Sequence, residues 1–200
     1  MTSRRILVSW IGHADLLAMA DDLGEAGKEL LAAARITGKY GEKPGPVKTA
    51  VSQGQFDEVH LLSNYPEVVH KPFSTWLGGK PIIHPVELTD PSDYSQVFRV
   101  VECVLAEVTG KQRRTPWELC MLLSPGTPAM AATWILLGKS RYPATFYQTF
   151  RGQLRTTTVP YDLVDDFVPE ILRNPDLNLQ HLASRNPSEV AGFESIVGES

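Results

Sequence analysis

The stretch "LCMLLSPGTPAMAATW" (residues 119–134) decides the fold, because it joins an apolar run to a helical pattern through a turn of Gly and Pro. A nearly continuous apolar run is typical of a strand that is covered on both faces, as in a parallel sheet. Thr127 can cap the helix that follows, and Pro128 suits its first position, where no N–H is needed. The stretch therefore predicts a buried strand, a tight turn and a helix with a well-specified start.

The start of this helix is suited to an anionic ligand, because unsatisfied amides and the positive end of the helix dipole lie there. Gly126 lets a ligand approach the backbone closely, and Ala129, Ala131 and Ala132 keep the first turn free of bulky side chains. Taken alone, the turn fits both a phosphate site and a helix that is merely well capped in the core. Both interpretations stay open at this point.

Other apolar runs have the same character: residues 6–10, 59–62, 81–86 and 144–150. Helical patterns separate them, most clearly over residues 94–108, where valines recur at helical spacing. Strands that alternate with helices predict an α/β fold, and we expect a Rossmann-like, doubly wound, mainly parallel sheet with helices on both faces. The amphipathic run over 16–35 contains Gly24 and Gly27 and fits two helices or a partly ordered insertion.

The 200 residues, 42% of them hydrophobic, are enough for one domain with a sizeable core. We expect this domain over residues 1–173, with 16–45 as an insertion, followed by a linker or docked tail over 174–200. The net charge of −4 gives no general reason to bind a nucleic-acid duplex. A nucleotide ligand must therefore be held by local features.

Two features of the sequence bear on where in the cell the protein is located. No apolar segment of the sequence approaches the length of a membrane span. Cys103 and Cys120 lie in apolar runs without close spacing, and we expect both to be buried, reduced packing thiols. Together these observations favour the cytoplasm.

A second special turn follows the first predicted strand, in "ILVSWIGHADL" (6–16), with Gly12 at the bend and Asp15 placed to cap a helix. In a doubly wound sheet the strand order reverses beside the first strand, so the carboxyl ends of the first and fourth strands flank the crevice where ligands bind. We therefore expect both turns to face one pocket.

Polar residues follow the other predicted strands and are expected on the same rim: Ser63, Asn64 and Tyr65 after the second, and Gln148, Thr149 and Arg151 at the end of the fifth. Arg151 is the best candidate for a cationic contact to phosphate, although an ordinary solvated arginine explains it equally. The basic cluster "KQRR" (111–114) precedes the fourth strand and is expected on the opposite edge, as a solvated loop or a contact to another domain.

The sequence carries no pattern that demands catalysis, and no cofactor, metal or catalytic residue is predicted. The histidines show no metal-ligand spacing with Cys or carboxylates: His13, His60, His70, His84 and His181. The chain has no Walker A lysine, no GxGxxG fingerprint and no Gly-x-Ser-x-Gly elbow. Helix capping and solvation explain Asp162, Asp165 and Asp166 more simply than an acidic site does.

The motifs "ILVSWIGHADL" (6–16) and "LLSPGTPAMAATWILLGKSRYPATFYQT" (122–149) resemble the two ligand-binding motifs of CARF domains, the CRISPR-associated Rossmann folds. They are most similar to the version at the N-terminus of RtcR-type sigma-54-dependent transcriptional activators. The likeness spans roughly residues 4–173, with 16–45 poorly matched. The tail "FESIVGES" (193–200) is similar to the opening of the AAA+ domain of such activators, so the chain resembles a sensor domain that stops where its ATPase would begin.

This resemblance implies a homodimer whose adjoining pockets bind a cyclic oligoadenylate or an RNA with a 2′,3′-cyclic phosphate end. In the family, ligand binding controls an attached AAA+ ATPase, which remodels sigma-54 RNA polymerase in a DNA-binding regulator. The resemblance also implies ligand contacts from two sets of residues: Gly12, His13 and Asp15 in the first turn, and Ser124, Gly126, Thr127, Ala129 and Met130 in the second.

Three functions follow from these patterns. The first is a regulatory binding module for an antiviral second messenger of the CRISPR type or for an RNA end in RNA repair. The second is a metal-independent ring nuclease that cleaves cyclic oligoadenylate, for which Ser124, Thr127 and Arg151 offer hydroxyl and cationic groups. The third is a Rossmann-like domain that only dimerises. We expect binding rather than catalysis.

Overall fold

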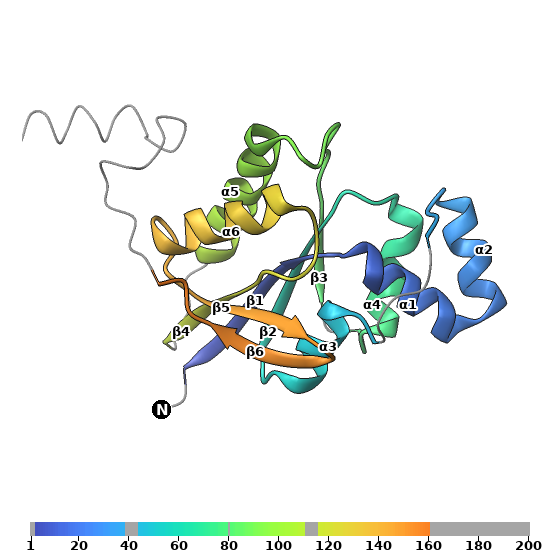
Figure 1. Ribbon diagram of the computed structural model, residues 1–200, viewed down its shortest axis with the longest axis horizontal. Coiled ribbons are helices and arrows are strands. Elements are labelled where there is room, and N and C mark those ends of the chain that lie inside the picture. The colour runs from blue at the N-terminus through green and yellow to red at the C-terminus, as the bar shows by residue number, and fades with distance from the viewer. Residues whose placement is uncertain (1–2, 39–43, 80, 111–115, 161–200) are drawn as a thin grey trace, which may run out of the picture. The chain divides into compact units, whose positions relative to one another are not determined.

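A computed structural model describes residues 3–38, 44–79, 81–110 and 116–160. These residues form a sheet with the strand order β3-β2-β1-β4-β5-β6 (Figure 1). Neighbouring strands from β3 to β5 are parallel, and β6 pairs with β5 in the antiparallel sense. The strands are β1 (Arg4–Trp10), β2 (Glu58–Ser63), β3 (Ile82–Pro85), β4 (Trp117–Leu122), β5 (Ala144–Phe150) and β6 (Gln153–Thr157). The predicted Rossmann-like, doubly wound α/β fold is confirmed.

Helices connect the parallel strands and cover both faces of the sheet, as the crossover connections of a parallel sheet require. They are α1 (His13–Leu23), α2 (Glu25–Ala33), α3 (Pro46–Gln53), η1 (Glu67–Val69), α4 (His70–Trp76), α5 (Tyr94–Gly110) and α6 (Pro128–Lys139). Helices α5 and α6 pack together on one face, while α1 contacts α3 and α4 on the other (Figure 1). None of the described helices is both long enough and apolar enough to cross a membrane.

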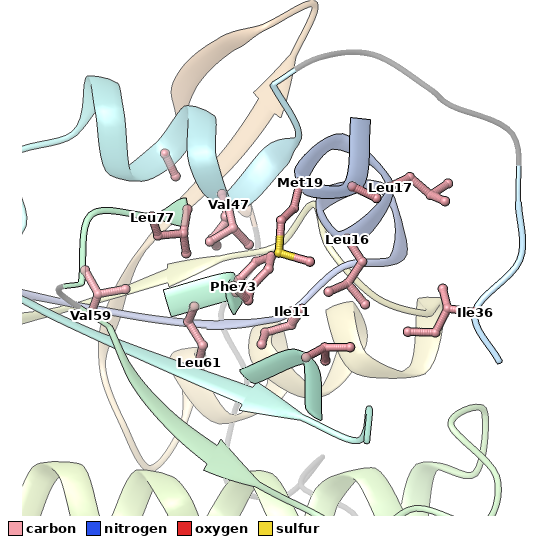
Figure 2. Packing of buried hydrophobic residues seen from close by; sticks show 14 of the residues in the cluster. Ile11, Leu16, Leu17, Met19, Ile36, Val47, Val59, Leu61, Phe73 and Leu77 are labelled. Carbon is pink, nitrogen blue, oxygen red and sulfur yellow. The ribbon is translucent and has the colours of Figure 1, made fainter. Parts of the chain in front are cut away.

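A hydrophobic core fills the space between the sheet and α1, α3 and α4 (Figure 2). Val59 and Leu61 of β2 point to this side, because alternate residues of a strand face the same way. They belong to the same cluster as Met19 of α1 and Phe73 of α4, both of which are fully buried. This core holds the start of α1 in place on the sheet.

The run over 16–35 forms two helices, which was one of the two interpretations left open. Gly24 ends α1 with a φ of +66°, a conformation that favours glycine. Gly27 has a different role, since a Cβ there would lie 2.4 Å from the carbonyl oxygen of Ala20. It lets α2 pack closely against α1.

Several features differ from the sequence-based expectations or lie beyond them. Cys103 is exposed on α5 rather than buried, because it lies off the valine stripe that faces the sheet, whereas Cys120 is buried as expected. Helix α4 and strand β6 were not predicted. The tail over 174–200, the acidic residues from Asp162 to Asp166, the cluster over 111–114 and part of the loop over 38–46 lie outside the described residues.

Candidate functional site

The two special turns meet at the point where the strand order reverses. Strands β1 and β4 are neighbours in the sheet, and their carboxyl ends lead into helices on opposite faces. A Cβ built on Gly12 would lie 2.9 Å from the Cβ of Pro125, so the first turn is in direct contact with the second. Both residues are buried, so the two turns are packed against each other at the candidate site. The meeting of the two turns is as the topology predicts.

The start of α6 is held by Thr127, as the sequence predicts. Its Oγ1 accepts a hydrogen bond from the Met130 amide at 3.3 Å, and Pro128 occupies the first turn of the helix. The same hydroxyl donates to the carbonyl oxygen of Pro91 at 2.7 Å, which ties the turn to the segment before α5. Pro128 has no N–H, the Met130 amide bonds the cap and the Ala131 amide bonds the Thr127 carbonyl oxygen. The candidate anion-binding end of α6 therefore consists of the positive end of the helix dipole and the Ala129 amide.

Gly126 and Ser124 form the exposed part of this turn. Gly126 has a φ of +99°, and a Cβ there would lie 2.6 Å from the sulfur of Met130. The Ser124 Oγ accepts a hydrogen bond from the Thr149 amide at 2.7 Å, which fastens the turn to the end of β5. Ala129 and Met130, in contrast, are buried.

Asp15 is buried beneath the turn that contains Gly12, and it caps a different helix from the one expected. Gly12 occupies the N-cap position of α1 without a side-chain hydrogen bond. The Asp15 Oδ1 instead accepts hydrogen bonds from the amides of Val47, at 2.8 Å, and Lys48, at 3.3 Å, so it caps α3. Burial raises the pKa of this carboxyl to about 7, against the lowering effect of its backbone hydrogen bonds. Its Oδ2 has no hydrogen-bond partner among the described residues.

The other predicted residues of the first half lie at the carboxyl ends of β1 and β2. His13 is exposed at the start of α1, with its Nε2 at 2.8 Å from the carbonyl oxygen of Thr37. Ser63 is buried, and its hydroxyl lies 2.9 Å from the Nε2 of His70. Asn64 follows it and is half-buried. His13 thus holds the segment after α2, and Ser63 holds the start of α4.

Gln148 and Arg151 lie at the far end of β5, and both are exposed. Arg151 and Gly152 form the two-residue loop between β5 and β6, with φ values of +49° and +69°. The Arg151 guanidinium lies over the ring of Phe150, 5.1 Å from its centroid. A hydrogen bond from the Thr149 amide to Ser124 connects this hairpin to the α6 turn.

The structure also brings together residues that sequence spacing did not group. The Nδ1 of His60 lies 2.9 Å from the Nε2 of His84 on the neighbouring strand, with the rings stacked. Glu58 lies beside His60, and Glu107 of α5 lies beside His84. Within the described ranges, no group of three His, Cys, Asp or Glu side chains is arranged to hold a metal ion.

A groove of about 450 Å³ lies elsewhere, beside the loop between α3 and β2, and shares no residue with the predicted site. Its lining residues are Arg5, Gln53, Gly54, Gln55, Tyr147, Leu154 and Thr156. Arg5 is engaged there in internal contacts: its guanidinium lies over the Phe56 ring and bonds the Tyr147 hydroxyl. The residues that line this groove therefore contact one another within the fold, and the groove does not lie where the two turns meet.

Comparison with solved structures gives distant likenesses. The chain is similar to Enterococcus italicus Csm6 bound to cyclic hexa-2′-fluoro-hexa-dAMP, with a TM-score of 0.49 and 18% sequence identity. The match covers 93% of this chain and 40% of that chain, so this chain spans less than half the length of Csm6. No protein-family model and no curated protein matches the sequence. A likeness this distant assigns neither a family nor a function.

Proposed function

We propose that this chain is a regulatory sensor domain that binds a cyclic oligoadenylate or an RNA with a 2′,3′-cyclic phosphate end. The observation that carries the proposal is the contact between the two turns, Gly12 against Pro125, at the reversal of strand order. These are the turns whose sequences resemble the ligand motifs of CARF domains. Open α/β sheets bind their ligands at this position.

The chemistry of the second turn supports a phosphate-bearing ligand. Thr127 fixes the first turn of α6 through two hydrogen bonds, so the anion-binding end is organised before a ligand arrives. Gly126 is exposed beside it and presents backbone without a side chain. Ser124 is exposed on the same turn, and its hydroxyl proton is available to a phosphate oxygen because its oxygen already accepts from Thr149.

The wider setting that we propose rests on the sequence resemblance alone. The domain would act inside the cell as a homodimer with two adjoining pockets, and ligand binding would control an attached AAA+ ATPase that acts on sigma-54 RNA polymerase at DNA. The likeness to Csm6 is too distant to add weight to this assignment.

The experiment that tests the proposal is a thermal-shift and calorimetric screen of the purified chain. The ligands are cyclic tri-, tetra- and hexa-adenylate, and a short RNA that ends in a 2′,3′-cyclic phosphate, with the same RNA ending in a 3′-hydroxyl as the matched control. A concentration-dependent rise in Tm with one ligand supports the proposal, because a ligand that binds the native state stabilises it by mass action. No shift with any of them contradicts it and favours a domain that only dimerises.

Chromatography of the same mixtures distinguishes binding from cleavage. A ring nuclease without a metal would need a 2′-hydroxyl held in line with its phosphate, together with groups that stabilise the developing charge. Linear adenylate products would assign that activity to the chain. An intact ring after prolonged incubation with saturating protein would leave sensing as its role.

A further inference from the structure

One face of the β5–β6 hairpin presents an exposed aromatic and basic surface that the predicted site did not include. Phe146, Gln148 and Phe150 alternate along β5 and therefore face the same side. Phe146 marks that side as the α6 side, since a Cβ on Gly138 of α6 would lie 2.6 Å from its ring. Arg155 of β6 lies opposite Gln148 and shares this face. We call Gln148, Phe150, Arg151 and Arg155 the hairpin patch.

Phe150 is the centre of the hairpin patch. This residue is 52% exposed. Two guanidinium groups lie against its ring, that of Arg151 at 5.1 Å from the centroid and that of Arg155 at 5.4 Å. An aromatic ring with arginines beside it is the combination that binds single-stranded nucleic acid, where bases stack and cations neutralise the phosphates.

Arg151 occupies a backbone position that favours other residues. In a two-residue hairpin loop with positive φ at both positions, Asn, Asp or Gly is strongly preferred at the first position. Arg151 has a φ of +49° there, and Gly152 follows with +69°. An arginine in this conformation lowers the stability of the turn. Contact of its charge with a ligand gives a physical reason for an arginine at this position.

The hairpin is firmly anchored, as a binding platform must be. The Gln53 side chain of α3 donates to the carbonyl oxygen of Gly152 and accepts from the amide of Leu154, both at 2.8 Å. At the other side, the Thr149 amide is bonded to Ser124 of the α6 turn. These hydrogen bonds fix the hairpin in position relative to α3 and to the α6 turn.

We propose that the hairpin patch is a second part of the ligand site, which binds the nucleotide next to the one whose phosphate lies at the start of α6. Its occupant is a single-stranded oligonucleotide: a base stacks against Phe150, and Arg151 and Arg155 neutralise the adjoining phosphates. The chain as a whole carries a net charge of −4, so an anionic partner must be attracted by a local basic surface such as this one. This inference rests on the proposed function and extends it from one phosphate to several linked nucleotides.

The test compares the affinity of the intact chain and its variants for whichever of the cyclic adenylates or the RNA with a 2′,3′-cyclic phosphate end binds the wild type, measured by calorimetry. Phe150→Ala should weaken binding about tenfold, and Phe150→Tyr should restore most of the affinity, because stacking needs only an aromatic face. Arg155→Gln should weaken binding and reduce the slope of log affinity against log salt by about 0.7, the contribution of one phosphate on a single strand. The matched controls are Leu23→Ala and Arg99→Gln, an exposed apolar residue and an exposed arginine on other elements, which should bind as the wild type does.

Arg151→Asn separates a role in binding from a role in structure. Asn suits the loop conformation, so this variant should unfold at a higher temperature and yet bind the same ligand more weakly. Wild-type affinity in Phe150→Ala, Arg151→Asn and Arg155→Gln would overturn this inference while the proposed function stands. A wild-type chain that binds neither the cyclic adenylates nor the RNA end would overturn both.

Discussion

The carboxylate of Asp15 accepts a hydrogen bond from the backbone amide of Val47 at 2.8 Å, which links the first turn of the candidate site to the start of α3. Asp15 follows Gly12 within the first turn of α1, and α3 carries the Gln53 side chain that anchors the β5–β6 hairpin. A side chain predicted to contact the ligand therefore lies beneath the site, where it joins the elements that surround it. We infer that Asp15 is a positioning residue.

The first prediction concerns the pH dependence of stability. The pKa of Asp15 is raised from 3.8 to about 7, so the folded chain holds a proton that the unfolded chain releases between these values. Binding of this proton stabilises the folded chain by about 4 kcal/mol. The stabilisation is fully present below about pH 4 and is lost as the pH rises through 7. Asp15→Asn keeps an acceptor for the Val47 amide and carries no charge. Its free energy of unfolding should equal or exceed that of the wild type at pH 8.

Urea unfolding of both proteins at intervals between pH 5 and pH 8 measures this effect. The difference in unfolding free energy between wild type and Asp15→Asn should move in favour of the variant as the pH rises. Asp15→Ala is the control, because it leaves the α3 amides without an acceptor and should be less stable at every pH. Parallel stability curves for wild type and Asp15→Asn would show that Asp15 is ionised throughout.

The second prediction concerns the contact between the two turns. The φ of Gly12 is −87°, which alanine adopts without strain, so any cost of Gly12→Ala arises from its Cβ. That atom would lie 2.9 Å from both the Pro125 Cβ and the Asp15 Oδ2. We expect a loss of about 1–3 kcal/mol in the free energy of unfolding, as for other overpacked sites.

Gly110→Ala is the matched control for this change, since a Cβ at the end of α5 would meet nothing within 4 Å. It should be neutral or stabilising, because alanine favours a helix over glycine. Equal stability of Gly12→Ala and wild type in urea unfolding would mean that the two turns are not packed against each other.

The strands and the reversal of strand order could be predicted from the sequence because each depends on local pattern. Buried parallel strands such as β1 and β4 have nearly continuous apolar sequences, and the connection rules then fix which turns meet. Strand β6 was missed because "QLRTT" is a half-exposed edge strand with few apolar residues. The loop of Arg151 and Gly152 was its only local signal, and arginine is atypical of such a loop.

The roles of single site residues could not be predicted, because they depend on contacts between distant parts of the chain. Asp15 looked like the cap of the helix it begins, but its partners lie on α3. Ser63 was expected on an open rim, and the structure turns its hydroxyl toward His70. Spacing along the sequence does not show which side chains meet across neighbouring strands, so the contact between His60 and His84 could not be predicted either.

The third prediction concerns the two thiols. Cys103 is exposed on α5, while Cys120 is buried in β4, where burial raises the pKa of its thiol to about 11. The thiolate is the reactive form, so Cys120 should be protected at neutral pH by both effects. Titration of the native chain with Ellman's reagent should show one fast thiol, and a second after unfolding. Cys103→Ser should abolish the fast phase, and two fast thiols in the wild type would contradict the burial of β4.

The last prediction tests the anion-binding end of α6 without disturbing the fold. Gly126 is a poor site for a blocking side chain, because its φ of +99° and the nearby Met130 sulfur make any substitution there strained. A Gly126→Trp exchange would therefore lose binding through damage to the turn. Pro128 is a better site, since it is exposed at the first position of the helix, where a carboxylate interacts favourably with the helix dipole.

Pro128→Glu should keep or slightly raise the unfolding temperature, and it should weaken binding of an anionic ligand about tenfold or more through charge repulsion at the amides of the first turn. Pro128→Gln has nearly the same shape without the charge and should bind close to the wild type. The difference between these two variants should shrink as the salt concentration rises, because the repulsion acts through solvent-exposed charges. Calorimetry with the adenylate or RNA end that binds the wild type gives the comparison. Equal affinities for Pro128→Glu and Pro128→Gln would mean that the ligand does not use the start of α6.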